Sequence, residues 1–545
     1  MTPEEIRILE AFELRLNFIL NHNSISSLLE KNLSEKLEVL FASGKLTSID
    51  LYLIFTGQYP AYSELKQFNF ELQVNKLDSI IGHFLELILS SAFRTRICLN
   101  TSLILAKNHN VMDVTHTHHY PHVTGIQRVV RKTVDCTINV SLVVFDSNYR
   151  SFTEIPKALF VAHLAKATPD RPTQDYKIVF EQRVLNFLYR CLPLLEKSNF
   201  GLLIKKLSLP LARVLKTKIS ARIRKMDRSQ SDERNDKLTN IYIPGSKLTI
   251  IDIPSNDGTL DIYQALFESK VLSTQLVLFD FIPIFHTWAV DRVGVAGHFN
   301  KYLRIVLFAD RIVGISSLVA EQAQLIVSAF KLERLNWGSN SQVIEFYNLP
   351  SGLEYDVELK SLVRVSRRIL IVGSIEPRKN HLQILSALQI LFEQGHHFEA
   401  VIVGNAGWEN EPIMRKIHEL QYAGAQIERR SHTDDSELER LLATSSLGIF
   451  ISEAEGFGLP IVESRAFGLR MLYSNIRPHI DISLNFPDDS IEIGDVTGLA
   501  KKILDRLSSN LVPASTSIEN LSQWSQWTNF LFLTDSFAAK QNSNR

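Results

Sequence analysis

The sequence has few of the residues that would place the protein in a specialised class. Its 545 residues include three cysteines, Cys98, Cys136 and Cys191, which lie far apart and form no C-x-x-C pair. This spacing indicates neither a disulfide framework nor a zinc site and is typical of a reducing compartment. Basic and acidic residues both total 59, so the formal net charge is zero and no overall charge favours nucleic acid as a partner.

Long apolar runs are also missing. The most apolar long stretch, residues 77–93, is interrupted by Asp78, His83 and Glu86, whereas a helix that spans a bilayer needs about 20 mostly apolar residues. The first residues contain no basic segment followed by an apolar one, so a secretory signal is not expected. The sequence therefore predicts a cytoplasmic protein without a membrane-spanning helix.

The composition is that of an ordinary globular protein, with 45% hydrophobic and 22% charged residues. The length exceeds the usual domain size of roughly 100–200 residues, which predicts two large domains and an appendage. In residues 1–105, apolar side chains such as Ile6, Leu9, Phe12 and Leu16 recur at helical spacing. We expect a helical extension that packs against the rest of the chain or against a partner.

After this extension, short β-branched runs alternate with amphipathic segments, a pattern typical of βαβ units and parallel sheets. We expect an α/β chain with one Rossmann-like domain at residues 106–346, a second at 347–515, and a closing helix and tail at 516–545. The expected strands are Leu276–Phe279, Arg311–Ile315, Ile369–Val372, Ala400–Val403, Leu447–Ile451 and Met471–Tyr473. Ligands of such sheets bind beyond the carboxyl ends of the strands.

A basic insertion interrupts the first predicted domain at about 188–237. Between Arg190 and Arg228 it carries eleven Lys and Arg residues against Glu196 and Asp227, with Leu, Ile and Phe interleaved. One interpretation is a helix lying on an anionic membrane surface, which predicts peripheral contact with the inner membrane. The other is a solvated helical face with a disordered end. Composition favours the two equally.

The most informative segment is Ser452–Glu463, which follows an apolar strand and opens a helical pattern. Gly456 and Gly458 allow a sharp turn and close approach to a ligand, and Pro460 suits a first helical turn. Amides at such a helix start attract phosphate. Glu455 and Glu463 add two carboxylates, which suit the hydroxyls of a sugar or a ribose.

This segment resembles the E-x7-E signature of family-4 retaining glycosyltransferases of the GT-B fold. The resemblance implies two facing Rossmann-like domains with a nucleotide-sugar site between them. It places Glu455 against the transferred sugar and Glu463 on the donor ribose, with Gly456, Phe457, Gly458 and Leu459 also binding the donor.

A second matching segment is Ile371–His381, again a strand, a tight loop and a helix start. The resemblance assigns Lys379 to the donor diphosphate, where an ammonium neutralises charge growing on the leaving group. Ser374 stands where many relatives have an Arg, which leaves one diphosphate contact in question. Arg378 lies next to Lys379 and either compensates for that Arg or pairs with an acid.

In the first predicted domain, Asp113–Thr115 and Thr124–Arg131 resemble the glycine loop that faces the diphosphate, and Gly125 lets the backbone come close. His116, His118, His119 and His122 stand between these segments. No Asp-x-Asp pair follows a strand here, so we expect no metal and place these histidines on the acceptor side or the surface.

Asp280 ends a predicted strand of the first domain and is a candidate for contact with sugar or acceptor, although a turn-capping Asp fits equally well. Phe279 stands where many relatives carry a His. Near the end of the chain, Trp524 and Trp527 resemble the family's C-terminal helix, which crosses back to the first domain.

The resulting prediction is a retaining hexosyltransferase without a cofactor that acts in surface polysaccharide synthesis. GDP-mannose is the favoured donor, since both Glu376–His381 and Thr124–Val129 look most like bacterial mannosyltransferases, and UDP-sugars stay open. The predicted acceptor is a glycan or a polyprenyl-linked glycan. Two alternatives remain: a nucleotide-sugar epimerase or phosphorylase on the same fold, and a degenerate scaffold that binds nucleotide or glycan without turnover.

Overall fold

The computed structural model describes residues 3–22, 46–74, 101–120, 125–166, 239–251, 257–290, 299, 302–333, 342–353, 359, 362–483, 489–508 and 520–532. Residues 1–164 and 239–545 form one compact unit, and residues 165–238 form another. The predicted basic insertion at 188–237 lies outside the described residues, as does His122.

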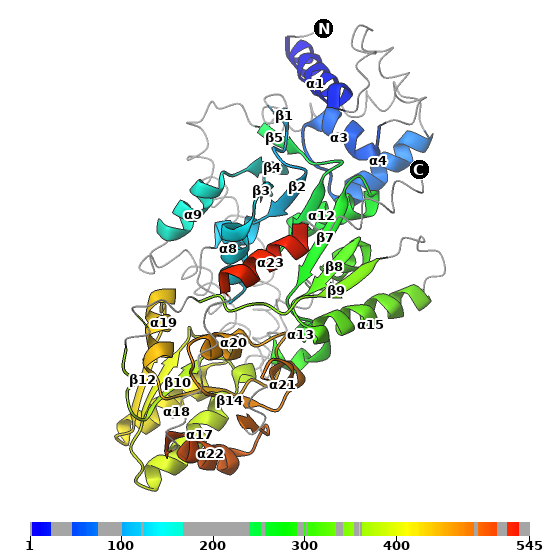
Figure 1. Cartoon of the computed structure of the whole chain (residues 1–545). Helices are drawn as coiled ribbons and strands as arrows, with labels where there is room; N and C mark the ends of the chain where they lie inside the picture. The colour runs from blue at the N-terminus through cyan, green and yellow to red at the C-terminus, as the bar shows by residue number, and fades with distance from the viewer. Residues whose placement is uncertain are drawn as a thin grey trace, which may run out of the picture. The chain divides into compact units, whose positions relative to one another are not determined.

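The described part of the extension contains the helices α1 (Pro3–His22), α3 (Ser48–Thr56) and α4 (Tyr62–Val74). Buried side chains of α1 and α3, among them Leu16 and Phe55, join the same hydrophobic core as the first sheet. The Tyr59 hydroxyl donates to the carbonyl of Ile241 at 2.8 Å. Packing against the rest of the chain is thus confirmed (Figure 1). The expected helical pattern ends early, because Ser102–Leu105 form strand β1, paired in parallel with β5 (Thr239–Tyr242).

The first large sheet has seven strands in the order β4-β3-β2-β6-β7-β8-β9. They are β2 (Asn110–Asp113), β3 (Val140–Asp146), β4 (Ser151–Glu154), β6 (Lys247–Ile250), β7 (Ser273–Leu278), β8 (Arg311–Gly314) and β9 (Val343–Phe346). The neighbours pair in parallel as expected, except for the edge strand β4, which is antiparallel to β3. Helices described in this part include α7 (Thr115–His119), α8 (Gly125–Cys136), α9 (Lys157–Lys166), α12 (Asp257–Ser269), α13 (Ile282–Phe285), η2 (Thr287–Ala289) and α15 (Ser317–Glu333).

The second sheet has six parallel strands in the order β12-β11-β10-β13-β14-β15. They are β10 (Arg368–Val372), β11 (Glu399–Val403), β12 (Gln426–Arg430), β13 (Leu447–Phe450), β14 (Met471–Ser474) and β15 (Ser490–Ile491). Numbered from β10, this is the Rossmann order 3-2-1-4-5-6, in which the winding direction reverses between β10 and β13. The crevice beyond the ends of these two strands is where such sheets bind their ligands.

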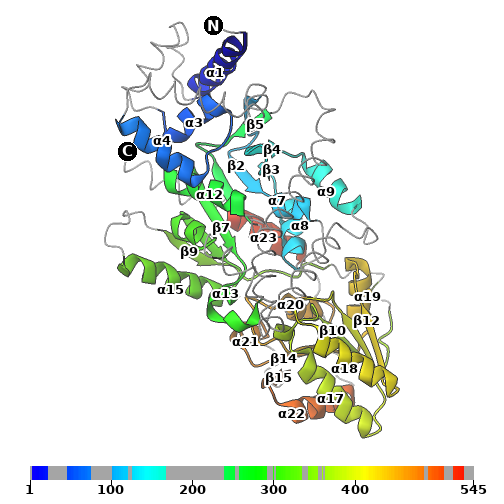
Figure 2. The same ribbon diagram turned by 180° about the vertical axis from the view of Figure 1, so that it is seen from behind.

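Helices cover both faces of the second sheet (Figure 2). They are η3 (Pro377–Lys379), α17 (His381–Glu393), α18 (Glu411–Tyr422), α19 (Asp435–Thr444), α20 (Leu459–Ala466), α21 (Arg477–Ile482) and α22 (Val496–Ser508). Because successive strand residues point to opposite faces, Ile369 and Ile371 join a core with α17, α18 and α22. Leu370 joins a separate core with α19. This alternation explains why β10 is apolar on both faces from Ile369 to Val372.

The last described helix, α23 (Asn520–Phe532), packs against the first sheet's part of the chain. The Trp527 indole nitrogen donates to Thr133 Oγ1 on α8 at 2.9 Å, and that of Trp524 donates to the Ser351 carbonyl at 2.7 Å. Both indoles are buried. The expected return of the C-terminal helix to the first domain is confirmed. Within the described residues, no helix is both long enough and apolar enough to cross a bilayer.

Candidate active site

Two loops of the second sheet meet where its winding reverses. After β10 the chain passes Gly373 and Ser374 and forms the short helix η3, and Asn380 then adopts a left-handed conformation (φ 51°) before α17 begins. After β13, residues 451–458 lead to Gly458 (φ 117°), which caps the start of α20. Both predicted strand, loop and helix arrangements are present. Ser374 is half-buried in the first loop.

A compact cluster of charges joins the two loops. Lys379 Nζ forms an ion pair with Glu455, and Arg378 Nη1 lies 2.9 Å from Glu455 Oε1. Arg378 also pairs with Glu376 (2.7 Å) and donates to the Ala454 carbonyl (2.8 Å). The Lys379 ammonium lies 4.9 Å from the centre of the Phe450 ring. Of the two roles open to Arg378, the structure shows pairing with acids.

Burial and charge oppose each other in this cluster. Burial alone raises the pKa of Glu455, but the cations of Arg378 and Lys379 outweigh it and lower that pKa to about 2. Burial lowers the pKa of Lys379, and Glu455 counteracts this effect. A carboxylate held ionised in a largely buried place can accept hydrogen bonds from hydroxyl groups without first losing a proton.

The first sheet's part of the chain supplies an acid to the same cluster. Asp280 follows β7, and its Oδ1 accepts the Ile282 amide at 3.0 Å, the expected turn-capping contact. Burial raises the pKa of Asp280, and Arg378 and Glu455 both act on it electrostatically. Asp280 therefore caps a turn and also lies beside the predicted catalytic groups.

Glycines permit close contact between the segment after β13 and the first sheet's part of the chain. A Cβ on Gly456 would lie 1.9 Å from the Phe279 carbonyl oxygen, so a side chain does not fit there. Ser316 Oγ, just after β8, donates to the Gly456 carbonyl at 2.6 Å. A Cβ on Gly125, the first residue of α8, would lie 3.1 Å from the Leu459 side chain. Phe457 is buried in the core that includes the first sheet.

Glu463, the second acid of the predicted signature, is buried and meets a partner that the sequence did not assign. Arg128 Nη1 on α8 donates to Glu463 Oε1 at 2.6 Å. The same guanidinium donates through Nη2 to Asp435 Oδ1 on α19 at 2.7 Å. Glu463, eight residues after Glu455, therefore takes part in a different ion network from the Glu455 cluster.

His479 is a second residue that the sequence did not single out. Its ring lies 5.0 Å from the ring of Phe450. The Ser474 hydroxyl gives its one hydrogen to the Ser452 carbonyl, so its oxygen accepts Nδ1–H of His479 at 2.9 Å. Burial lowers the pKa of His479 to about 4. The ring is thus neutral at pH 7, with its unprotonated Nε2 facing Gly458.

The structure therefore brings together most of the predicted site residues. Arg378, Lys379, Glu455, Gly456 and Asp280 form one cluster, while Gly125, Leu459 and Glu463 lie along the first turns of α8 and α20. The sequence contained a signal for Arg128, which lies three residues after Gly125, but none for His479. The donor-binding and catalytic roles of these residues remain predictions.

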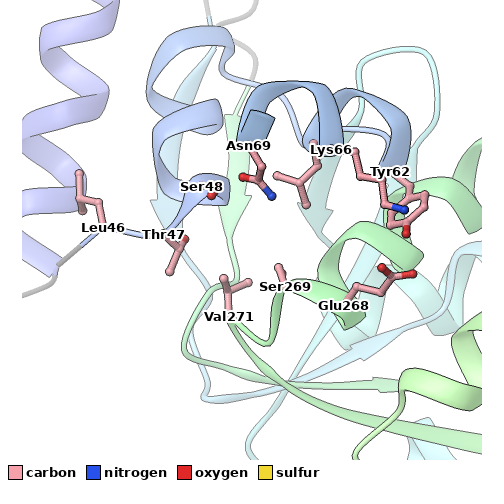
Figure 3. Close-up of a pocket in the computed structure, with 10 residues that line it drawn as sticks. Leu46, Thr47, Ser48, Tyr62, Lys66, Asn69, Glu268, Ser269 and Val271 are labelled. Atoms are coloured by element: carbon pink, nitrogen blue, oxygen red, sulfur yellow. The ribbon is translucent and has the colours of Figure 1, made fainter. Parts of the chain in front are cut away.

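A separate hollow of about 410 Å³ lies between α3, α4 and the end of α12 (Figure 3). Lys66, Asn69 and Glu268 line it, together with Leu46, Thr47, Ser48, Tyr62, Leu65, Ser269 and Val271. None of the predicted site residues contributes to it. The hollow is therefore distinct from the cluster around Glu455.

Comparison with known proteins agrees with this geometry in the second half of the chain. Residues 362–516 match the family model described as Glycosyl transferases group 1. These residues form a group 1 glycosyltransferase domain. The domain contains the second sheet and both loops of the cluster. With two Rossmann-like sheets in the chain, the predicted α/β arrangement of the GT-B fold is confirmed.

Part of the chain is also similar to curated bacterial enzymes. The serotype-specific mannosyltransferase WbdA of Escherichia coli is 26% identical over 273 residues, which are 47% of this chain and 32% of WbdA. The O-antigen chain mannosyltransferase B of Escherichia coli is 32% identical over 108 residues, 20% of this chain and 28% of that protein. The chain thus spans about a third of the length of these relatives.

Among solved structures, Anabaena HepE in complex with UDP and glucose has a TM-score of 0.44 at 12% identity, over 80% of this chain and 100% of that one.

Proposed function

We propose that the protein is a retaining glycosyltransferase that moves a hexose from a nucleotide-sugar donor to a glycan or lipid-linked acceptor. Mannose is the first candidate for the sugar and GDP-mannose for the donor. The meeting of Lys379, Arg378 and Glu455 at the reversal point of the second sheet carries this proposal. The site would need no metal, because its cations and helix start neutralise a diphosphate.

Each part of the cluster has a task in this reaction. Lys379 and the amides at the start of α20 bind the diphosphate and stabilise the charge that develops as the bond to the sugar C1 breaks. Glu455, ionised at neutral pH, accepts hydrogen bonds from sugar hydroxyls. Glu463 binds the ribose. The acceptor oxygen bonds to C1 on the face that the diphosphate leaves, and its proton passes to a diphosphate oxygen, so no separate protein base is required.

The proposed setting is the synthesis of a bacterial surface polysaccharide in the cytoplasm. It rests on the names of the Escherichia coli relatives, both of which are mannosyltransferases. Peripheral contact with the inner membrane belongs to the same proposal, because a polyprenyl-linked acceptor would lie there.

A thermal-shift screen with GDP, UDP, ADP and TDP tests the nucleotide part of the proposal. A ligand that binds only the native state raises the melting temperature by mass action, and we expect the largest increase with GDP. Lys379→Ala should reduce that increase, whereas Lys416→Ala on the outer helix α18 should not. No shift with any of the four nucleotides would contradict the proposal.

Product analysis then tests the reaction. With GDP-mannose and a mannose-containing glycan acceptor, we expect GDP and an extended glycan. An epimerase would convert the sugar of the donor without any acceptor.

A degenerate scaffold is the second candidate, and two substitutions favour it. Ser374 and Phe279 stand where the resemblance leads us to expect Arg and His. Release of GDP from GDP-mannose, even slowly and without acceptor, would exclude this candidate. Tight nucleotide binding without release in any assay would support it.

A further inference from the structure

Arg128 connects three helices that are far apart in sequence. Nη1 of this α8 residue donates to Glu463 on α20 at 2.6 Å, and its Nε and Nη2 donate to Asp435 on α19 at 3.0 and 2.7 Å. The side chains of Arg128 and Glu463 are only 9% and 3% exposed, while that of Asp435 is 35% exposed. A planar guanidinium can hold two carboxylates at once in a fixed geometry, whereas the ammonium of lysine is a compact point charge and cannot.

The first turns of α8 and α20 lie alongside each other. Gly125 at the start of α8 allows the approach of Leu459 at the start of α20. One helical turn further on, Arg128 meets Glu463. Gly352 adds to the fit, because a Cβ there would lie 2.5 Å from the Arg128 side chain. The ion pair of Arg128 and Glu463 is thus part of close packing between the first turns of α8 and α20.

The charge balance shows what this contact does for Glu463. Burial raises the pKa of Glu463, and Asp435 raises it further, while Arg128 lowers it. Arg128 and Asp435 are the charged groups that act on this carboxylate among the described residues. Without Arg128, the buried carboxylate would face a second acid and no cation, and would tend to take up a proton.

Arg128 engages one oxygen of the carboxylate, Oε1. In the part of the chain that the structure describes, Oε2 accepts no hydrogen bond from another side chain or from the backbone. A carboxylate with one oxygen anchored and the other open is suited to accept a hydroxyl hydrogen in one direction. A buried ion pair is in general no better for stability than a well-packed apolar pair, so stability alone does not account for this arrangement.

We propose that Arg128 is a positioning residue of the donor site, which holds Glu463 so that its second oxygen accepts hydroxyl hydrogens of the donor ribose. This inference rests on the proposed function. It makes ribose recognition depend on α8, a helix outside the group 1 domain. Asp435 in turn holds the other side of the guanidinium.

The test compares two ligands that differ only in the ribose hydroxyls. The nucleoside diphosphate with the largest thermal shift and its 2′,3′-dideoxy form are titrated into the full-length protein by calorimetry. Because a hydrogen bond to a charged group is worth about 1.5–3 kcal/mol, the native protein should prefer the ribose form by about 10-fold or more. In Arg128→Gln this preference should fall to within about twofold of equality.

The matched control removes another arginine–glutamate pair. Arg477 on α21 pairs with Glu321 on α15 at 2.5 Å, with both side chains about half exposed. Arg477→Gln should keep the full preference for ribose. A general loosening of the protein would weaken both ligands equally in Arg128→Gln and leave their ratio unchanged, and this result would overturn the inference.

Milder variants keep the test decisive if Arg128→Gln does not fold. Asp435→Asn leaves the guanidinium in place but removes one of its anchors, so the preference should fall only in part. Arg128→Lys should also give an intermediate ratio. If both variants keep the native ratio, the inference fails.

The native protein separates this inference from the proposed function. If it binds neither ligand, the proposed function fails as well. If it binds both ligands equally, only the ribose role of Glu463 and this inference fail.

Discussion

The two sheets contribute to the candidate site in different ways. The second sheet carries the charges on the loops after β10 and β13, where Lys379, Arg378 and Glu455 meet at the reversal point. The first sheet's part of the chain contributes backbone and shape, through the Phe279 carbonyl and the Ser316 hydroxyl against Gly456. Its described residues also add Asp280 and the Arg128 contact. In the proposed function, the second sheet thus supplies the groups that bind the diphosphate, while the first sheet contacts the loop after β13 and limits how it can move.

This contrast predicts that the largest loss of activity follows from a charge change in the second sheet. Glu455→Gln should lower turnover by about 100- to 1,000-fold, the usual effect of removing one electrostatic contact to a transition state. The affinity for nucleoside diphosphate should stay equal or increase, because Lys379 and Arg378 lose a competing anion. Release of diphosphate from the donor measures turnover, and calorimetry measures affinity.

Glu437→Gln, which removes an exposed partner of Arg430, is the control and should turn over normally. Native turnover in Glu455→Gln would remove this residue from catalysis.

The next effect concerns acid sensitivity of the second sheet. The folded protein protonates His479 only near pH 4, whereas the unfolded chain does so near 6.5. Unfolding therefore takes up a proton between these values, and stability falls as the pH falls from 6.5 to 4. At about 1.4 kcal/mol per pH unit, the loss is on the order of 3 kcal/mol. Denaturant unfolding at several pH values should show a flatter profile for His479→Gln.

An unchanged profile in His479→Gln would show that this ring does not titrate as described.

A smaller effect is expected where the two sheets touch. Gly456→Ala places a methyl group 1.9 Å from the Phe279 oxygen, and overpacking of this kind costs about 1–3 kcal/mol. Turnover should fall with it, because the loop that carries Glu455 must move. Gly395→Ala tests alanine at a positive φ with open space around it. Gly395→Ala should lower the melting temperature without lowering turnover in the folded protein. An equal loss of turnover in both variants would contradict a specific role for the contact between Gly456 and Phe279.

The smallest effect should come from an exposed ion pair. Arg477→Gln breaks the pair with Glu321, where solvent screens the charges, so the melting temperature should not change measurably. The buried pair of Arg128 with Glu463 should differ sharply in Arg128→Gln, because an unpaired buried carboxylate is costly. Equal melting temperatures for the two variants would mean that burial does not distinguish these pairs.

Much of the second sheet could be predicted from the sequence. The expected runs Ile369–Val372 and Leu447–Ile451 form β10 and β13 to within one residue at an end, and the helix after Gly458 begins as expected. Local signals were sufficient here, since apolar runs and Gly or Pro at the turns act over a few residues. Less of the first sheet could be predicted from the sequence. Its antiparallel strand β4 and the strand β1 inside the predicted helical extension had no clear signal of their own.

The sequence by itself determined the central strands of the second sheet, where the loops after them turn, and which of these loops carry carboxylates and cations, because side-chain periodicity and turn chemistry are local. Only the tertiary structure decided which of these groups meet. The strand order places β10 beside β13 and thereby joins Lys379 to Glu455. Helix docking brings Arg128 to Glu463 across 335 residues. Contacts of this kind depend on how sheets and helices pack, which no local pattern specifies.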